Sequence, residues 1–594
     1  MHTFKSLLAL LLSISIISCK TNDRIYNQGI NITPKPMELI QKNGNFTLKN
    51  NTVFVVNDES VRRIVDLFTS KIRRSTGFSL MQQQDKPSSD YIEINIVADS
   101  DVNDEGYTIE ATDRGVTVNA KTPQGIFYGL QTVMQLLPAE IESPHIVKIP
   151  WTIPCVHVKD EPRFKYRGQH LDVCRHFLDV GYIKKQLDVL AMFKINKFHW
   201  HLTDDQGWRV ESKKYPQLNS TSATRTEGEG GIYGPYYYTQ AQIREIVDYA
   251  EERFIEVIPE VELPGHAVAA LAAYPEYSCT GGPFEVRNVW GVANDVFCAG
   301  NDTTFAFLTD IIEEMIPLFK SDYFHIGGDE CPKGRWKQCA KCQARIKEEK
   351  LSDEHELQSW FIRRIEKVLL KHNKKMIGWD EILEGGLAPS ATVMSWRGEK
   401  GGIDAANMGH DVIMTPGGWL YLDHYQGDPK VEPMAIGGYT TLEKTYSYDP
   451  VPEGLQQNKA RHILGAQANV WTEYLYSPEQ TEYMTYPRII ALAEVTWSSK
   501  EQKNYSDFER RIANQLVRLD GHNINYHIPI PEQAGSSSDF IAFIDSAVVD
   551  LKTTRPVKIL YTDNLEEPTN INSKEYTAPL KFSKSTILKV RSAL

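Results

Sequence analysis

The clearest candidate for chemistry in this sequence is the run His325-Ile-Gly-Gly-Asp329-Glu330, in which two carboxyl groups close a short apolar segment. The glycines would let a ligand approach the backbone closely. Adjacent acids repel each other, so the pair is costly unless each carboxyl group has its own task. Cleavage of a glycosidic bond supplies two such tasks, protonation of the leaving oxygen and stabilisation of charge near the anomeric carbon. Taken alone, the run also fits a surface Asp-Glu pair or a metal site.

Acidic, basic and aromatic residues follow seven other apolar runs. They are Asp172 and Arg175; His199, His201, Asp204 and Asp205; Glu260, Glu262 and His266; Trp379 and Asp380; Trp396; Tyr421 and Asp423; and Trp471 and Glu473. Such a set suits a neutral sugar, because carboxylates and arginine bind hydroxyl groups while indole rings enclose apolar parts. A metal site is the weaker interpretation, because three tryptophans would serve no purpose around a hard cation.

The apolar runs themselves predict the element that positions these side chains. They are Tyr166–Asp172, Lys197–Asp204, Ile255–Glu260, Tyr323–Asp329, Lys375–Trp379, Thr392–Trp396, Asp411–Met414 and His462–Trp471. Helical patterns lie between several of them, and alternating strands and helices favour parallel pairing. Eight units indicate a (β/α)8 TIM barrel, whose active site lies at the C-terminal ends of its strands. The polar residues should therefore meet on one face.

The fold class is therefore α/β, and we predict four segments along the 594 residues. Residues 1–19 are a lipoprotein signal peptide, 20–160 a small α/β domain, 161–525 the catalytic barrel and 540–594 a β-rich C-terminal segment that resembles part of a β-sandwich. The proline-containing stretch Pro154–Phe164 reads as a linker, and the Gly- and Tyr-rich stretch Thr221–Tyr238 as a long loop on the active face.

The sequence of the first 19 residues predicts that the protein is exported from the cytoplasm. Lys5 precedes an apolar run that is too short for a typical membrane span and fits a signal peptide. Its end, Ile16-Ile17-Ser18-Cys19, resembles a bacterial lipobox, which implies cleavage before Cys19 and acylation of that residue; a plain signal peptide is the alternative. We expect a cell-envelope lipoprotein held at a membrane by its acyl chains.

The composition limits the kinds of partner and cofactor that this protein is expected to bind. The net charge of −12 argues against nucleic acid, which needs clustered Lys and Arg. No cofactor and no metal are predicted, and a monomer or homodimer is expected. Among the cysteines, Cys279 and Cys298 flank one loop and could pair in an exported protein. Cys331, Cys339 and Cys342 include a Cys-x-x-Cys, but without a nearby fourth ligand zinc is weaker than structural or free thiols.

Ordered motifs then give a resemblance to a known family. The runs Leu171-Asp-Val-Cys-Arg175-His-Phe, Phe198-His-Trp-His-Leu-Thr-Asp204-Asp-Gln-Gly-Trp-Arg209, Pro259-Glu-Val-Glu-Leu-Pro-Gly-His266 and the Asp329-Glu330 run resemble glycoside hydrolase family 20. The runs Gly378-Trp-Asp-Glu381, Ser395-Trp396, Tyr421-Leu-Asp423 and Trp471-Thr-Glu473 continue the match in the family's order. The resemblance covers the whole barrel, and the preceding α/β domain is similar to the one that commonly precedes it.

The resemblance implies a substrate-assisted mechanism, in which the sugar's own acetamido group is the nucleophile. Glu330 matches the general acid, Asp329 the residue that holds the acetamido N–H, and Tyr421 the hydroxyl that binds the acetamido carbonyl. The remaining matches are substrate-binding: Trp379, Trp396 and Trp471 as walls of the acetamido pocket, Arg175, Asp423 and Glu473 as contacts to hydroxyls, and Asp204 and His266 as a supporting pair around the acid.

The function implied is an exo-β-N-acetylhexosaminidase acting on terminal β-linked GlcNAc or GalNAc. An intramolecular nucleophile gains from proximity, and we expect an apolar setting to raise the pKa of Glu330. The alternatives are a lacto-N-biosidase-type enzyme that releases a disaccharide, a catalytically inactive glycan-binding lipoprotein and a metal-dependent hydrolase. Asp423 and Glu473 argue against the first, and the presence of both Asp329 and Glu330 argues against the second.

Overall fold

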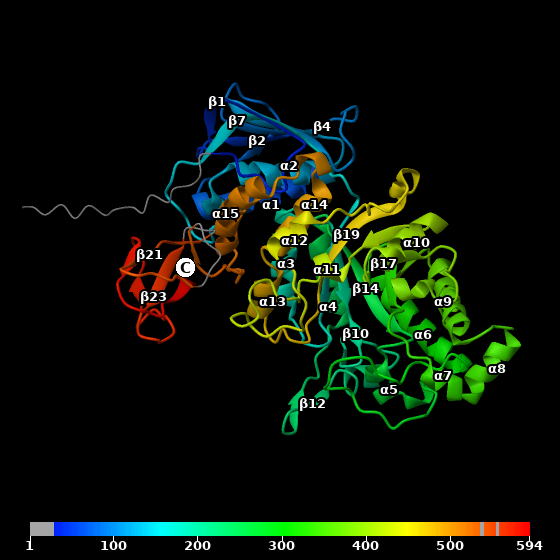
Figure 1. The fold of residues 1–594 in the computed structure, drawn as a ribbon. Coiled ribbons are helices and arrows are strands. Elements are labelled where there is room, and N and C mark those ends of the chain that lie inside the picture. Colours follow the sequence, from blue (N-terminus) through cyan, green and yellow to red (C-terminus); the bar gives the residue numbers. More distant parts are fainter. Residues whose placement is uncertain (1–28, 535–539, 554–556, 594) are drawn as a thin grey trace, which may run out of the picture. The chain divides into compact units, whose positions relative to one another are not determined.

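The computed structural model describes residues 29–534, 540–553 and 557–593 (Figure 1). Residues Ile30–Pro529 form one compact unit, and residues from Ile530 onward belong to a second. The predicted signal peptide and its Cys19 lie outside the described residues. Within the described residues, no helix combines the length and the apolar character needed to cross a membrane.

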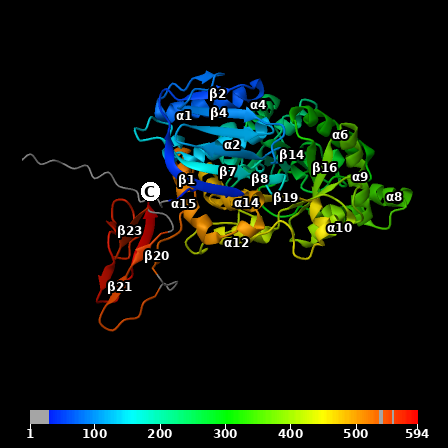
Figure 2. The ribbon, with the colours of Figure 1, turned by 90° about the horizontal axis from the view of Figure 1, so that it is seen from above.

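The first part of the large unit is an α/β domain with a seven-stranded mixed sheet in the order β1-β7-β5-β6-β4-β2-β3 (Figure 2). Its strands are β1 Glu38–Thr47, β2 Val53–Val56, β3 Gln82–Gln83, β4 Tyr91–Ile96, β5 Tyr107–Ala111, β6 Gly115–Ala120 and β7 Thr152–Asp160. Helices α1 (Arg62–Thr76) and α2 (Pro123–Leu136) accompany the sheet. Thr122 caps α2 and proline occupies its first turn, which is the start expected of a helix.

The prediction of a linker at Pro154–Phe164 is wrong, because the first half of this segment belongs to strand β7. The strand is internal to the sheet, but β5 pairs only with Val156–Asp160. At Pro154 the strand therefore has a ladder partner on the β1 side alone. Proline is tolerated where one edge of a strand is unpaired, since its missing N–H then leaves no gap in a ladder.

The catalytic part is a closed barrel of eight parallel strands in the order β14-β15-β16-β17-β18-β19-β8-β9, which confirms the predicted fold class. The strands are β8 Tyr166–Asp172, β9 Lys197–His201, β14 Glu256–Leu263, β15 Tyr323–Gly327, β16 Lys375–Trp379, β17 Thr392–Ser395, β18 Val412–Met414 and β19 Ile463–Val470. Each corresponds to one predicted apolar run. Burial on both faces explains why these segments are so continuously apolar.

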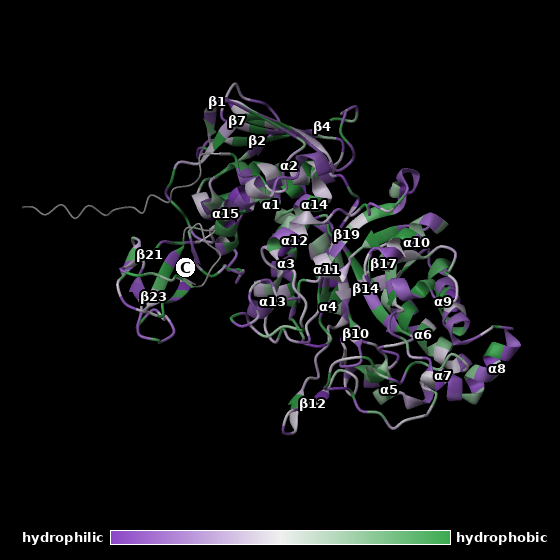
Figure 3. Ribbon diagram, viewed as in Figure 1, coloured by the Kyte–Doolittle hydropathy of each residue, from purple (hydrophilic) through white to green (hydrophobic). Residues whose placement is uncertain are grey.

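Helices cover the outside of the barrel or lie in the connections at its two ends, and the last of them, α15, packs against Ala139–Glu142 of the α/β domain. They are α3 Val180–Met192, α4 Gln240–Glu251, α5 Val268–Ala273, α6 Asp302–Met315, α7 Gly334–Gln338, α8 Ala340–Glu348, α9 Glu354–Lys371, α10 Lys400–Met408, α11 Gly417–Leu420, α12 Leu442–Ser447, α13 Pro478–Thr485, α14 Arg488–Trp497 and α15 Tyr505–Gly521. Figure 3 shows both hydrophobic and hydrophilic residues along outer helices such as α9. In α9 the buried stripe contains Leu357, Phe361, Ile365 and Leu369, a helical period that packs one face on the barrel.

Two hairpins interrupt the connections on the active side of the barrel. Strands β10 (Thr203–Asp204) and β11 (Gly207–Trp208) follow β9 directly. The predicted loop Thr221–Tyr238 contains a second hairpin, formed by β12 (Arg225–Glu227) and β13 (Gly231–Tyr233). Its Arg225 donates a hydrogen bond to the carbonyl of Arg175, at 2.7 Å, so this segment braces the loop after β8.

The C-terminal unit is a small β module. Its strands are β20 Glu532–Gln533, β21 Ala547–Val549, β22 Leu551–Lys552, β23 Lys558–Thr562, β24 Lys574–Glu575, β25 Leu580–Phe582 and β26 Lys589–Ala593. Strand β23 pairs antiparallel with both β24 and β26, and β21 pairs with β25. Few side chains are buried, among them Leu551, Ile559 and Leu560, so the module has only a small hydrophobic core.

Candidate active site

The Asp329–Glu330 pair follows β15 at the C-terminal end of the barrel, on a turn of unusual backbone geometry. Gly327, Gly328 and Glu330 all have positive φ, at 67°, 94° and 40°. At Gly327 a Cβ would also lie 1.8 Å from a carboxylate oxygen of Glu262. The glycines therefore serve both conformation and space, and a non-glycine residue held at positive φ is typical of a functional constraint.

Glu330 is the end of a chain of polar contacts that crosses the barrel mouth. The Nε2 atom of His266 lies 3.3 Å from Glu330 Oε2, and its Nδ1 lies 3.3 Å from Asp204 Oδ1. The other oxygen of Asp204 is 2.9 Å from an Arg175 nitrogen. The structure thus brings together four residues from four different strand ends, and the order Asp–His–Glu fixes the position of the candidate acid.

The environment of Glu330 differs from the predicted apolar setting. The hydrogen bond from His266 lowers the pKa of Glu330, and this outweighs the opposing effect of burial. Burial lowers the pKa of His266, but Asp204 more than compensates and raises it well above the ordinary value. Before a sugar binds, a protonated His266 therefore favours the ionised form of Glu330, the opposite of our expectation.

Asp329 sits deeper and has an oxygen available for a ligand. Its Oδ2 lies 3.8 Å from His266 Nε2, whereas Oδ1 is buried without a hydrogen-bond partner among the described residues. Burial raises the pKa of Asp329. A buried acceptor left unpaired costs about 1–3 kcal/mol, so Oδ1 is well suited to accept an N–H from a bound molecule.

Two further carboxyl groups beside Asp329 were not in the predicted set of catalytic and substrate-binding residues. Both oxygens of Glu262 are buried without a partner among the described residues. Burial, with the neighbouring Asp329 charge, raises the pKa of Glu262 well above its usual value, and the pKa of Glu381 to about 9. Both residues lie in the quoted motifs, but only the fold shows that they flank Asp329.

Aromatic rings form the wall next to these carboxyl groups. Trp379 donates its indole N–H to Glu260 at 2.9 Å, and Trp396 donates to Glu381 at 3.0 Å. The rings of Trp396 and Tyr421 are stacked, with centroids 6.1 Å apart and planes 16° from parallel. Trp471 lies 5.9 Å from Trp379 and 6.4 Å from Tyr421, so the predicted aromatic residues gather in one place.

The predicted hydroxyl-binding residues lie on the neighbouring side of Trp471. The Arg175 guanidinium is 5.2 Å from the Trp471 ring and 3.8 Å from Glu473. Glu473 Oε2 and Asp423 Oδ1 are buried and unpaired within the part of the chain that the structure describes. Burial raises the pKa of both carboxyl groups. Like Asp329, they present acceptors that a hydroxyl group could satisfy.

A group of histidines lies behind the tryptophans in the barrel interior. The carboxylate of Glu260 is contacted by His199 at 3.1 Å, His201 at 2.5 Å, His325 at 2.9 Å and the Trp379 indole. This geometry brings potential metal ligands together. Because protein groups already surround both oxygens of Glu260, we interpret the cluster as a support for Trp379 rather than as a cation site.

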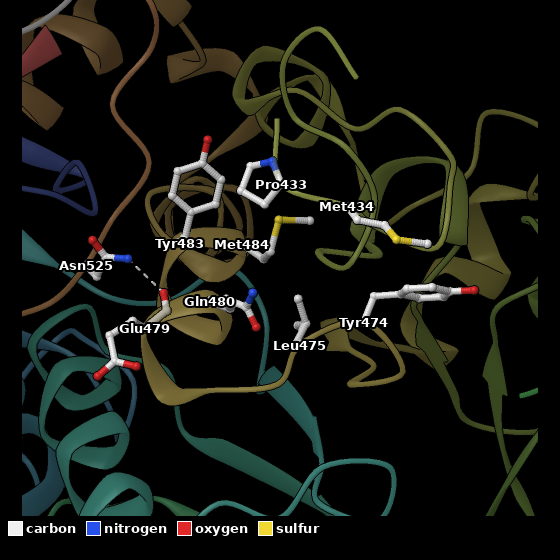
Figure 4. Close-up of a pocket in the computed structure, with 9 residues that line it drawn as sticks. All are labelled: Pro433, Met434, Tyr474, Leu475, Glu479, Gln480, Tyr483, Met484 and Asn525. Carbon is white, nitrogen blue, oxygen red and sulfur yellow. Dashed lines mark hydrogen bonds between the residues drawn. The ribbon is translucent and has the colours of Figure 1, made fainter. Parts of the chain in front are cut away.

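One small cavity lies beside the loops that carry the site (Figure 4). It is lined by Pro433, Met434, Tyr474, Leu475, Glu479, Gln480, Tyr483, Met484 and Asn525. In the close-up, the Asn525 side chain donates to the carbonyl of Glu479 at 2.9 Å. None of the predicted site residues lines it, and its mostly apolar lining lacks the convergent carboxylates found around Asp329.

Known proteins match both parts of the large unit. The description "Glycosyl hydrolase family 20, catalytic domain" matches residues 164–500, and "Glycosyl hydrolase family 20, domain 2" matches residues 29–161. A β-hexosaminidase of Porphyromonas gingivalis is 55% identical over 99% of this chain and 76% of its own length. A β-hexosaminidase of Vibrio furnissii is 35% identical over 78% of this chain and 76% of its own.

Solved structures agree with the sequence matches. The family 20 β-N-acetylhexosaminidase from Streptomyces coelicolor superposes with a TM-score of 0.75 at 30% identity, covering 84% of this chain and 97% of that one. The family 20 exo-β-N-acetylglucosaminidase from Vibrio harveyi, in complex with N-acetylglucosamine, gives 0.75 at 29% identity, with 84% and 78% covered.

A barrel that gathers an acid pair, unpaired carboxylate oxygens and indole rings at the ends of its strands defines a glycoside hydrolase. The sequence and structure matches make the assignment specific. The chain belongs to glycoside hydrolase family 20, as its motifs predicted, and is an enzyme of the β-hexosaminidase kind.

Proposed function

We propose that this enzyme is an exo-β-N-acetylhexosaminidase that removes terminal β-linked N-acetylglucosamine or N-acetylgalactosamine by a retaining, substrate-assisted mechanism. The observation that carries the proposal is the pairing of Asp329 with Glu330. Asp329 Oδ1 is a buried acceptor with no described partner, and the adjacent Glu330 carboxyl is held by His266. One acid can thus orient an acetamido group while its neighbour transfers a proton.

In the first step the acetamido carbonyl oxygen attacks the anomeric carbon as the glycosidic C–O bond breaks. Glu330 gives its proton to the leaving oxygen, and Asp329 accepts the acetamido N–H as positive charge develops on the oxazolinium ring. Tyr421 donates to the acetamido oxygen and positions it for attack. Water then attacks the anomeric carbon from the face that the leaving group vacated and passes a proton to Glu330. The two inversions retain the configuration.

Binding energy for a single terminal sugar would come from the two sides of the site. Trp379, Trp396 and Trp471 would enclose the acetamido methyl group, which a sugar with a 2-hydroxyl lacks. On the other side, Arg175 would bind ring hydroxyls, and the unpaired oxygens of Asp423 and Glu473 would accept the hydroxyls at C4 and C6. Because these contacts use the hydroxyls at which a glycan would continue, they favour release of one sugar.

The test measures p-nitrophenol release from the N-acetyl-β-D-glucosaminide beside the matching β-glucoside. We expect turnover of the first alone and inhibition by a thiazoline analogue of the intermediate. Asp329→Asn should lower kcat by about 10²–10³-fold, as expected on loss of a group that stabilises developing charge. Turnover of a lacto-N-bioside but not of the monosaccharide substrate would favour a disaccharide-releasing enzyme. No turnover of either by folded protein would favour a glycan-binding protein.

We also propose that the enzyme is a lipoprotein of the cell envelope. The support is the sequence of residues 1–19 alone, in which a short apolar run ends at Cys19. Labelled palmitate should be incorporated into the wild-type chain in a bacterial host, and Cys19→Ala should abolish both the label and membrane association. Equal labelling of the two chains would reject the anchor.

A further inference from the structure

Four cysteines from two separate strand-to-helix connections converge at one point, two from the segment after α5 and two from the start of α8. Cys279 Sγ lies 3.7 Å from Cys342 Sγ, and Cys298 Sγ lies 3.7 Å from Cys342 Sγ and 3.8 Å from Cys339 Sγ. All four sulfurs lie within 4.8 Å of one another. The sequence presents them as two unrelated pairs, 279/298 and 339/342. The fold adds Cys279 and Cys298 to the Cys-x-x-Cys as its third and fourth partners, and Cys331 is not part of this group.

The spacing of the sulfurs matches a tetrahedral metal site. With Zn–S bonds of about 2.3 Å, the edge of a regular tetrahedron is ~3.8 Å, which is the separation found for three sulfur pairs. A disulfide would require about 2.05 Å between two sulfurs and would leave each sulfur with one partner. Here Cys298 and Cys342 each contact two others. The Cys279–Cys298 disulfide that the sequence allowed is not formed, and all four are free thiols.

The four thiols lie in a largely buried and closely packed environment, unlike isolated cysteines on a protein surface. Cys298, Cys339 and Cys342 are buried and Cys279 is half-buried. Gly300 packs so closely on the second loop that a Cβ would lie 2.1 Å from the Lys341 carbonyl carbon. The backbones of the two connections are therefore in close contact beside the sulfur atoms.

We propose that Cys279, Cys298, Cys339 and Cys342 bind one Zn²⁺ ion as a structural site with four thiolate ligands. Four thiolates fill a tetrahedral shell and leave no position for water, so the ion would be structural rather than catalytic. A soft all-sulfur set selects zinc over magnesium or calcium, which prefer oxygen ligands. The site is separate from the glycosidase chemistry, and no step of the reaction passes through it.

The location suggests what the ion stabilises. Cys279 and Cys298 lie in the connection from β14 to α6, which also carries His266. Cys339 and Cys342 lie in the connection from β15 to α9, which carries Asp329 and Glu330. One protein contact already joins the two connections nearby: Trp336 Nε1 donates to the Phe297 carbonyl at 2.9 Å. Within its own connection, Phe297 N donates to the Pro264 carbonyl at 3.0 Å. Zinc would lock this junction and hold the acid and its histidine in register.

The experiment determines the metal content and thiol state of the full chain, purified without chelator or added reductant and incubated with Zn²⁺ before dialysis. We expect about one zinc ion per chain by inductively coupled plasma mass spectrometry. The four thiols should resist alkylation until a strong chelator is added. Chelation should also lower the melting temperature by several degrees, because the binding energy of a structural ion is folding energy.

Variants assign the ion to the cluster. Cys342→Ser should lose the zinc, whereas Cys155→Ser, which changes a buried cysteine of the α/β domain, should retain it. If Cys342→Ser does not fold, the wild-type metal content and intact mass still decide the matter. A wild-type chain without zinc overturns the proposal. Its four cysteines would then either form two disulfides, seen as a mass lower by four hydrogen atoms, or remain free thiols that are alkylated without chelator.

Discussion

At the scale of single residues, the active site contains two groups of acidic residues. In one group the carboxylate is bound by protein donors, and in the other one carboxylate oxygen has no partner. Asp204 and Glu260 are surrounded by histidine, arginine or tryptophan donors. Asp329, Asp423 and Glu473 each keep a buried oxygen without a partner among the described residues. The first group fixes geometry, and the second carries a desolvation cost that a sugar's N–H and O–H groups would remove.

The contact between His266 and Glu330 makes a prediction about pH. His266 lowers the pKa of Glu330, so the free enzyme should lose the acid form at unusually low pH. In His266→Gln that pKa should rise, and the alkaline limb of kcat/KM should move to higher pH. We also expect kcat/KM to fall at least ~10-fold, because a positioned acid is worth roughly 10²–10⁴. A limb that stays in place, or moves to lower pH, would show that His266 does not control the acid.

Glu381 makes a second residue-scale prediction, this time about stability. Burial raises its pKa to about 9 from 4.5, so the native state holds the proton more tightly than the unfolded state does. The contribution of the protonated Glu381 carboxyl group to the free energy of unfolding is therefore fully present below pH 4.5 and is lost as the pH rises towards 9.

Glu381→Gln keeps the acceptor for the Trp396 indole but removes this titration. We expect the variant to gain stability over wild type as the pH rises from about 5 to 9, by several kcal/mol at about pH 8, and to match it near pH ~4, because each pKa unit is worth about 1.4 kcal/mol. Urea unfolding across this range is the measurement, with Glu384→Gln in the same turn as the control. If the unfolding free energies of Glu381→Gln and wild type differ by the same amount at both ends of the pH range, Glu381 does not have the raised pKa.

At the scale of elements, the turn that ends β15 determines where both acids point. Gly327→Ala would place a methyl group at φ 67° and 1.8 Å from a Glu262 oxygen that is itself buried. We expect a loss of about 2–4 kcal/mol in unfolding free energy and about 10²-fold in kcat, because small displacements of catalytic groups are expensive.

Gly334→Ala is the matched control in the same connection. Nothing lies within 4 Å of its would-be Cβ, and it is the first residue of α7, where alanine favours the helix. Its stability and kcat should stay close to wild type. Equal behaviour of the two variants in urea unfolding and steady-state kinetics would mean that the β15 turn tolerates a side chain.

At the scale of the molecule, the α/β domain and the barrel share buried polar contacts within one compact unit. Lys194, in the turn after α3, lies 3.1 Å from Asp160 at the end of β7, and both side chains are fully buried. Asp160 also accepts a hydrogen bond from the Trp497 indole at 2.9 Å, and Arg518 of α15 donates to the carbonyl groups of Met134, Gln135 and Leu137. Such a junction should make the two parts unfold together.

Replacing Lys194 tests this coupling. Lys194→Met leaves the Asp160 charge without its partner in the interior, which should cost about 3–5 kcal/mol. Calorimetry should show one transition for the large unit, moved as a whole to lower temperature. Lys184→Met, which removes a partly exposed ion pair between α3 and Glu245 of α4, should change stability by less than ~1 kcal/mol. Separate transitions, with only one displaced, would show that the α/β domain and the barrel unfold independently.

The sequence by itself determined the barrel, its family and the identity of most residues that gather at the barrel mouth. Buried parallel strands are apolar on both faces, so their runs stand out, and parallel pairing requires the residues after each run to share one end. Strand β7 was missed because its proline lies where only one neighbour pairs, which is a property of the sheet and not of the segment.

Only the tertiary structure decided how the gathered groups affect one another. Whether Glu330 is made more or less acidic depends on a histidine 3.3 Å away that is 64 positions earlier in the chain. Likewise, Cys279 and Cys342 are far apart in sequence yet 3.7 Å apart in space. Charge coupling and metal geometry depend on distances through space, which local pattern does not encode, whereas strand, helix and motif follow from side-chain order along the chain.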